Sequence, residues 1–177
     1  MKAAFFAYRK WAFGLYSQLP KQASKSIAAV YVAENFEKPA PKDAKVIDPK
    51  KISALAASLR KEKISTLLFI GWSWMVPKEI TDEFTCVCLH PSPLPKYRGG
   101  SPLQNQIIAG EAESAVTLFK MTQGMDDGDI YEQEKISLEG ELEDIFERMS
   151  CTGAKAITRM LSRFEKGNCS ARKQDET

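Results

Sequence analysis

ISTLLFIG, residues 64–71, is an almost uninterrupted apolar run with the length of one β-strand. A strand that covers only one face of a core alternates apolar and polar residues, whereas a continuous apolar run is typical of a strand buried on both faces. Strands of this kind occur in parallel sheets that carry helices on both sides. The segment therefore predicts the centre of a parallel sheet.

The elements around this strand alternate between strand and helix patterns. Strand composition marks residues 3–8, 26–32, 85–89 and 115–121, and the more polar run 130–137 is expected at a sheet edge. Apolar residues at helical spacing mark residues 11–19, 52–59 and 142–164. Residues 34–48 contain several prolines and charges and predict an irregular connection. The fold class is therefore α/β and Rossmann-like, with a mostly parallel central sheet flanked by helices.

Length and composition predict one domain. The chain has 177 residues, of which 44% are hydrophobic, and single cores span about 100 to 200 residues. We expect the domain to cover residues 1–167. Residues 168–177 have no apolar face and predict a C-terminal tail that is mobile or held by something outside this chain. Gly153 interrupts the last helix and is expected to cost about 1 kcal/mol relative to Ala if it is exposed.

Charge and targeting signals favour a small-molecule partner and a cytoplasmic location. Lys and Arg number 25 against 23 Asp and Glu, a formal net charge of +2, which is too small for general nucleic-acid binding. The apolar run at the N-terminus, residues 3–7, is shorter than a signal peptide or a membrane span requires. The four cysteines form neither a CxxC pattern nor a disulfide framework, as expected in a reducing compartment.

His90 is the only histidine and follows the buried strand TCVCL. Ligands of open α/β sheets bind at the carboxyl ends of the strands, so His90 is a candidate acid, base or oxyanion partner. Cys86, Cys88 and His90 alternate and are expected on one face of the strand. The outer two lie about 13 Å apart, too far to share one metal ion, so no metal is expected and the thiols are expected to pack as small hydrophobic groups.

Two loops are candidate partners of His90. The loop PSPLPKYRGGSP, residues 91–102, contains four prolines and two adjacent glycines, a composition suited to a rigid loop that wraps a ligand. GMDDGDIY, residues 124–131, holds Asp126 between glycines. Calcium binding is one interpretation, but the EF-hand spacing is missing. An Asp placed against His90 is the functional interpretation we favour, because it would orient the imidazole or relay a proton.

Two further segments carry candidate binding residues. GWSWMVP, residues 71–77, follows the central strand and offers either an aromatic wall for a flat heterocycle or packing against the last helix. Arg9 and Lys10 follow the first strand, where they either hold a phosphate or form a solvated pair. The turn there lacks GxGxxG and GxxxxGK[ST], so nicotinamide and Walker-type nucleotide binding lose their support.

These motifs together resemble the folate-dependent formyltransferases, which use N10-formyltetrahydrofolate. HPSPLPKYRGGSP (90–102) matches the family pattern HPSxLPxYRGxxP, GMDDGDI (124–130) matches GxDxGDI, and GWSWMVPKEI (71–80) is similar to the pterin-side loop. The resemblance extends over almost the whole chain. It implies that residues 1–167 form a formyltransferase catalytic domain with N10-formyltetrahydrofolate as co-substrate and no metal.

The resemblance also implies roles for individual residues. His90 would stabilise the oxyanion that forms when an amine attacks the formyl carbon, and Asp126 would position His90 and help to remove the amine proton. Leu94-Pro95 would be a cis peptide. The folate site would contain Trp74, Met75, Val76, Gly124, Met125 and Asp126. The acceptor site would contain Tyr8, Arg9, Lys10, Lys96, Arg98 and Gly99.

One position departs from the family pattern. The family has Asn-x-His at the end of the strand, whereas this chain has Cys88-Leu89-His90, so a thiol replaces an amide donor to the formyl oxygen. The loss of one such donor costs about 2.7 to 4 kcal/mol in other enzymes. Either a neighbouring group substitutes for the amide or the chain is slow or inactive.

The acceptor is left with several alternatives. Methionyl-tRNA formyltransferases carry a further C-terminal domain, for which 177 residues leave no room. Glycinamide ribonucleotide formyltransferases have a glycine-rich turn where this chain has AYRKW. The chain most resembles formyltransferases of nucleotide-linked (UDP or dTDP) amino sugars, whose products enter bacterial surface polysaccharides such as lipopolysaccharide. Glycinamide ribonucleotide formylation and a folate or sugar-nucleotide binding module without turnover are the alternatives, and a homodimer is possible in the amino-sugar group.

Overall fold

The computed structural model describes residues 1–36 and 40–175 of the chain. Within these residues the strands form one sheet in the order β3-β2-β1-β4-β5-β6-β7. The strands are β1 (Ala3–Ala7), β2 (Ile27–Ala33), β3 (Lys45–Ile47), β4 (Thr66–Ile70), β5 (Thr85–His90), β6 (Glu113–Lys120) and β7 (Ile130–Ser137). The helices are α1 (Lys10–Ser17), α2 (Lys21–Ser26), the 3₁₀ helix η1 (Pro49–Leu55), α3 (Ala56–Lys61), α4 (Lys78–Glu83), α5 (Pro102–Ile108) and α6 (Leu142–Glu165).

The sheet is parallel from β3 to β5 and antiparallel from β5 to β7. The prediction of a mostly parallel α/β sheet is confirmed. β4 lies between β1 and β5, and all of its residues are buried, as its continuous apolar run predicts. β7 lies at one edge, also as predicted.

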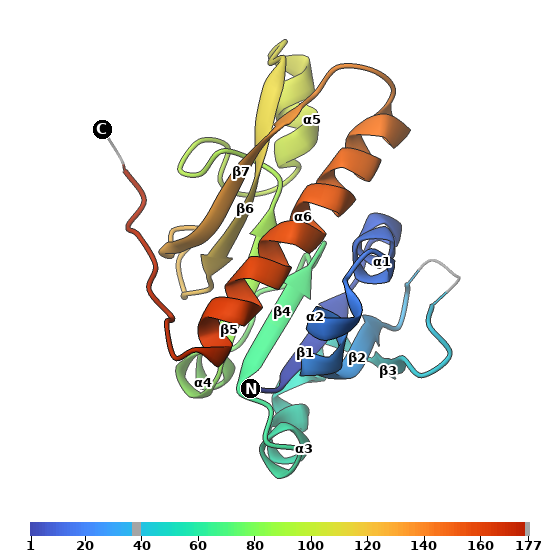
Figure 1. Cartoon of the computed structure of the whole chain (residues 1–177), viewed down its shortest axis with the longest axis vertical. Helices are drawn as coiled ribbons and strands as arrows, with labels where there is room; N and C mark the ends of the chain where they lie inside the picture. The colour runs from blue at the N-terminus through green and yellow to red at the C-terminus, as the bar shows by residue number, and fades with distance from the viewer. Residues whose placement is uncertain (37–39, 176–177) are drawn as a thin grey trace.

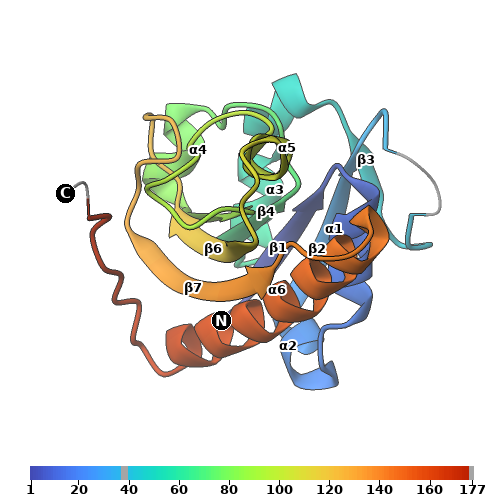
Figure 2. The same ribbon diagram turned by 90° about the horizontal axis from the view of Figure 1, so that it is seen from above.

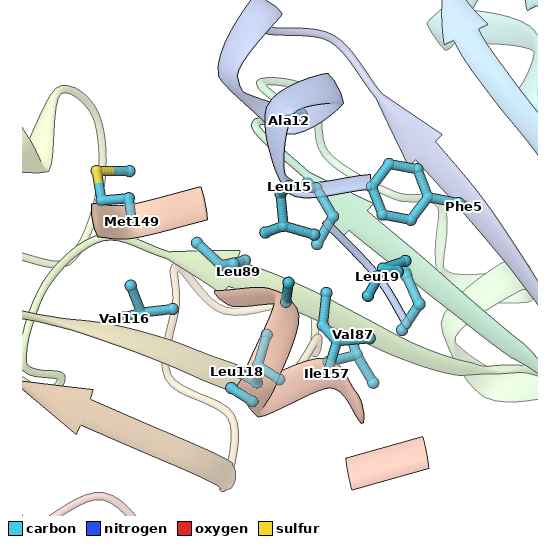
Figure 3. Packing of buried hydrophobic residues seen from close by; sticks show 14 of the residues in the cluster. Phe5, Ala12, Leu15, Leu19, Val87, Leu89, Val116, Leu118, Met149 and Ile157 are labelled. Atoms are coloured by element: carbon cyan, nitrogen blue, oxygen red, sulfur yellow. The ribbon is translucent and has the colours of Figure 1, made fainter. Parts of the chain in front are cut away.

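Helices cover both faces of the sheet (Figures 1 and 2). In Figure 2 helices α2 and α6 lie on one side of the strands, and α3 and α4 lie on the opposite side. Alternate residues of a strand belong to different cores: in β4, Leu68 and Ile70 pack in the core with α6, and Leu67 and Phe69 pack in the other core. Figure 3 shows the α6 side, where Ile157 lies near Val87 and Leu118 of the sheet.

Three local differences from the predictions have physical reasons. The three-residue strand β3 lies inside the connection 34–48 that the sequence predicts as irregular, and residues 37–39 of that connection lie outside the described residues. Residues 52–59 are divided between η1 and α3, and within η1 the backbone leaves the helical region at Lys51, just before the predicted helix begins. Gly153 is buried, and a Cβ there would lie 2.5 Å from Leu15 Cδ1 and 2.8 Å from Leu89 Cδ1. It allows close packing of α6 on the sheet and is not an exposed weak point.

The tail leaves α6 and passes along the outer edge of β7 (Figure 2). Backbone hydrogen bonds join Ile130 and Arg172 in both directions, at 2.7 and 2.9 Å. The tail is therefore held by the chain itself, an attachment that its polar sequence does not indicate. In the part of the chain that the structure describes, no helix is both long and apolar enough to cross a membrane.

Candidate functional site

A cavity of about 520 Å³ opens where the chain leaves the carboxyl ends of β1, β4 and β5. β1 is the point at which the strand order reverses, since β2 and β3 follow on one side and β4 on the other, and such switch points bind ligands in open α/β sheets. The volume lies within the usual range of small-molecule sites. The walls come from Arg9 and Trp11, residues 71–76, 88–91 and 99–104, Phe119, Met121, Thr122, residues 124–126, and Phe146 and Met149 of α6.

The cavity brings together most of the predicted site residues. Those that line it are Arg9, Trp74, Met75, Val76, Cys88, His90, Gly99, Gly124, Met125 and Asp126. Four predicted acceptor-site residues lie outside its lining: Tyr8, Lys10, Lys96 and Arg98. Their roles, like those of the lining residues, stay predictions.

His90 ends β5 and is only 6% exposed. Its Nε2 lies 2.8 Å from the backbone oxygen of Tyr97. A carbonyl oxygen only accepts hydrogen bonds, so this contact assigns the ring proton to Nε2. Nδ1 is then the ring nitrogen that is free to exchange a proton, and it lies 3.5 Å from Oδ2 of Asp126.

Asp126 is held in an uncommon backbone conformation, with φ at +51°. Asp and Asn occupy the left-handed region more readily than most residues. Its Oδ2 accepts a hydrogen bond from the backbone N–H of Gly99 at 2.8 Å, so the loop after His90 fixes the carboxylate opposite the imidazole. Gly128 allows the tight bend that follows, since a Cβ there would lie 1.7 Å from the backbone oxygen of Lys120.

The loop 91–102 is fixed at several points. Gln106 is fully buried and donates from Nε2 to the carbonyls of Pro91 and Pro102, both at 2.9 Å, which ties the two ends of the loop together. The Ser92 carbonyl accepts from Thr117 Oγ1 at 2.6 Å. Leu94-Pro95 is cis, as the family resemblance implies. His90 therefore lies at the start of a loop with little freedom.

Cys88 lies in the cavity wall beside this pair. Burial raises the pKa of its thiol, and the nearby Asp126 charge raises that pKa further. Cys88 is therefore a neutral thiol, which offers one weak S–H donor, and its Sγ lies 3.7 Å from the Leu89 oxygen. Among residues 1–36 and 40–175, no group of three or more His, Cys, Asp or Glu is placed to hold a metal ion.

Aromatic and methionine side chains form another wall. The Trp74 ring lies 4.4 Å from the ring of Tyr8 and 5.1 Å from that of Trp72, measured between centroids. Met75 and Met125 are 64% and 67% exposed although both line the cavity. Exposed apolar groups beside a tryptophan suit a flat, partly apolar ligand such as a pterin ring. The residues present therefore fit a folate.

Among the four cations predicted for the acceptor site, Arg9 is the one that lines the cavity. Its guanidinium carbon lies 4.5 Å from the ring centroid of Tyr8, and the side chain also lines the cavity. Tyr8 therefore contacts two residues of the wall, Arg9 and Trp74, and supports the site without lining it.

Two residues contact this site in roles that the sequence patterns do not indicate. Tyr97 contributes through its backbone oxygen, which any residue type would supply. Gln174, from the tail, donates to the backbone carbonyls of Asp126 and Gly128 and accepts from Arg98. Its only sequence signal is a polar side chain in a polar tail, which is too general to identify it.

Comparisons with known proteins relate most of the chain to one family. A family model described as Formyl transferase matches residues 14–161. A methionyl-tRNA formyltransferase from Coxiella burnetii is 33% identical over 114 residues, which cover 62% of this chain and 36% of the relative. The chain spans 36% of the length of this relative and 54% of the length of a methionyl-tRNA formyltransferase from Rhodopseudomonas palustris.

Solved structures agree in fold. Methionyl-tRNA formyltransferase from Clostridium thermocellum superposes with a TM-score of 0.72 at 27% identity and covers 100% of this chain and 70% of its own. Phosphoribosylglycinamide formyltransferase from Bacillus halodurans superposes with a TM-score of 0.72 at 21% identity, covering 96% and 100% of the two chains. The second likeness concerns the fold alone.

Proposed function

Because this chain belongs to the formyl transferase family, we propose that it transfers a formyl group from N10-formyltetrahydrofolate to a primary amine. One observation carries the proposal: His90 Nδ1 and Asp126 Oδ2 lie 3.5 Å apart in the wall of a cavity that fits a folate. Acyl transfer to an amine requires a group that stabilises a developing oxyanion and a group that accepts a proton. Nδ1 of His90 and the facing carboxylate can accept the proton, and an imidazole protonated at Nδ1 then carries the positive charge that stabilises the oxyanion.

The proton that the amine loses has a defined destination. A neutral amine must give up one proton as its nitrogen forms the new C–N bond. Nε2 already carries a proton that it donates to Tyr97, so the proton is accepted at Nδ1 or at the facing carboxylate of Asp126. The rate of transfer is expected to fall at low pH, because a protonated amine has no lone pair for attack.

The folate would lie against the aromatic and methionine wall. Trp74, Met75, Val76, Gly124 and Met125 all line the cavity. When bound, N10-formyltetrahydrofolate supplies the activated formyl group. The residues of this chain orient it and exclude water from the formyl carbon.

For the acceptor we propose a nucleotide-linked deoxyamino sugar, as used in surface polysaccharide synthesis. The support is a cavity of small-molecule size with Arg9 at its wall, a cation suited to a phosphate or a sugar hydroxyl. A net charge of +2 also favours a small acceptor over a polyanion. The cytoplasmic location and a homodimer stay predictions.

Methionyl-tRNA is a second candidate acceptor. The observation that favours it is the 33% identity to the Coxiella burnetii methionyl-tRNA formyltransferase. Because the chain spans only 36% of that relative, its tRNA substrate is a hypothesis for this protein. Glycinamide ribonucleotide, the remaining alternative from the sequence, belongs in the same comparison.

The test is an assay of tetrahydrofolate release with N10-formyltetrahydrofolate and a panel of acceptors: UDP- and dTDP-linked amino sugars, methionyl-tRNA and glycinamide ribonucleotide. Turnover with an amino sugar supports the proposed acceptor, and turnover with methionyl-tRNA alone replaces it. His90→Asn is expected to lower kcat/KM by about 10²- to 10⁴-fold with the fold retained. Near-normal turnover of that variant rejects the assigned site.

Leu68→Ala is the matched control for His90→Asn. Leu68 is fully buried in β4 and belongs to the core rather than to the cavity lining. The variant is expected to lose about 2 to 5 kcal/mol of unfolding free energy through a cavity in the core. Its kcat at a temperature where it is folded should equal that of the unaltered chain, which separates loss of stability from loss of chemistry.

A further inference from the structure

The side-chain amide of Gln174 joins the two loops that border His90. Its Nε2 donates to the backbone oxygens of Asp126 at 2.7 Å and Gly128 at 2.8 Å. Its Oε1 accepts from Nε and Nη2 of Arg98 at 3.0 and 2.7 Å. Carbonyls only accept and a guanidinium only donates, so these partners fix the orientation of the amide.

The tail delivers this amide from a fixed point. Two residues before Gln174, the backbone of Arg172 pairs with Ile130 in both directions, and its Nη2 donates to Gln133 Oε1 at 2.6 Å. Figure 2 shows this part of the tail beside β7. Gln174 is therefore attached to the sheet edge on one side and to the site loops on the other.

The contacts of Gln174 converge on the carboxylate that faces His90. Asp126 has a φ of +51°, and its carboxylate is held by the N–H of Gly99, the residue after Arg98. Gln174 binds the backbone of Asp126 and the side chain of Arg98. Gln174 thereby limits the movement of Asp126, which accepts the hydrogen bond, and of Arg98, which directly precedes its donor Gly99.

We propose that Gln174 is a positioning residue for the Asp126–His90 pair. It holds the Arg98–Gly99 segment and the Asp126 loop at a fixed separation. At this separation Asp126 Oδ2 accepts a hydrogen bond from Gly99 N and lies 3.5 Å from His90 Nδ1. The catalytic consequence rests on the proposed function. The effect on the Asp126–Gly99 hydrogen bond does not.

Gln174→Ala and Gln174→Glu in the full chain test this role, with Lys173→Ala as the control at an adjacent exposed tail position. A glutamate keeps an acceptor for Arg98 but donates nothing to the carbonyls of Asp126 and Gly128. The readouts are kcat, the KM of the acceptor, and amide hydrogen exchange of Gly99 and Leu68 by NMR. Exchange at Gly99 reports the hydrogen bond to Asp126 without requiring turnover, and exchange at Leu68 reports the core.

Both Gln174 variants are expected to lower kcat by about 10- to 100-fold, because small misplacements of catalytic groups cost rates of this order. Gly99 exchange should accelerate about tenfold while Leu68 exchange stays unchanged, and the acceptor KM rises only if the predicted acceptor contacts of Arg98 and Gly99 are lost as well. Lys173→Ala should leave all readouts unchanged. Unchanged Gly99 exchange, or faster exchange with unchanged kcat, overturns the inference. Absence of turnover in the unaltered chain rejects the proposed function, and unchanged Gly99 exchange in the Gln174 variants still rejects the positioning contact.

Discussion

The two ring nitrogens of His90 have different partners, and this difference determines what the imidazole can do. Nε2 is occupied as a donor to Tyr97, so proton exchange is confined to Nδ1. Nδ1 faces Asp126, whose carboxylate is fixed by a backbone N–H from the neighbouring loop. The direction of proton movement is thus determined by a main-chain oxygen and a main-chain nitrogen.

Asp126→Asn removes the charge of this pair with little change in shape. Asn tolerates the left-handed backbone of this position, and its side-chain oxygen still accepts from Gly99. We expect thermal unfolding to be nearly unchanged and kcat to fall by about 10²- to 10⁴-fold. Steady-state kinetics and a melting curve measure the two effects, and a kcat within threefold of the unaltered chain would show that the carboxylate charge is not needed.

Cys88→Asn introduces the amide that the family pattern has at this position. A neutral thiol is a poor donor to an oxyanion, and one good donor is worth about 10²-fold in kcat elsewhere, so kcat is expected to rise towards that factor. Cys88→Ser is the control with a small donor and is expected to fall between the two. A lower kcat in Cys88→Asn would indicate that the thiol is needed for packing and that the missing amide does not limit the rate.

At the residue scale, the sequence predicts a functional residue when its side-chain type determines its chemical role. His90 and Asp126 are identifiable because an imidazole and a carboxylate occur at characteristic positions in two distinctive loops. Tyr97 is not identifiable, because its contribution is a backbone oxygen, and Gln174 is not, because the fold of the tail determines where its amide lies. The cavity also leaves Lys96 and Arg98 outside its lining, since loop direction is not encoded by charge alone.

At the scale of elements, predictability follows the length and burial of each segment. β4 and β5 are found close to their bounds because both are buried and therefore apolar. β3 has three residues, with Val46 well exposed, so it leaves no pattern. Gly153 shows the opposite error: its residue type indicates a weak helix, whereas its place between Leu15 and Leu89 makes it a packing requirement.

Gly153→Ala is accordingly expected to destabilise the protein. The helix would gain about 1 kcal/mol in propensity, but the new methyl group would overlap Leu15 and Leu89 and force them to move, for a net loss of about 1 to 2 kcal/mol. Urea unfolding measures the difference. Ser162→Ala, at an exposed position of α6, provides the propensity gain without the overlap and should be neutral or slightly stabilising. A stabilised Gly153→Ala protein would mean that α6 has space to shift away from the sheet.

At the scale of the whole molecule, the two cores on opposite faces of the sheet keep ionisable groups away from water. Burial raises the pKa of the Cys86 thiol to about 12 from an ordinary value of 9.0. Between these two values the unfolded chain releases the thiol proton and the folded chain keeps it. The stabilisation is complete below pH 9 and is lost as the pH rises through this window.

Urea unfolding at pH 8, 9 and 10 measures this dependence. For the unaltered chain we expect the free energy of unfolding to fall above pH 9, with Cys86 contributing a slope of about 1 kcal/mol per pH unit. Cys86→Ala should show a shallower slope, although its stability at pH 8 is lower because of the lost side chain. Cys169→Ala changes an exposed cysteine and should keep the slope of the unaltered chain. Equal slopes for all three proteins would contradict the assignment to Cys86.

The tail contact also has a consequence for how the protein folds. His90, Asp126 and Gln174 come from segments separated by 36 and 48 positions, and each join between them closes a long stretch of chain. We expect these contacts to form after the local helices and the central strands, because the loops and the tail that carry them are positioned by the sheet. During refolding from urea, helical circular dichroism should therefore recover before formyl transfer. Under mild denaturant, the site should be among the first parts of the molecule to open.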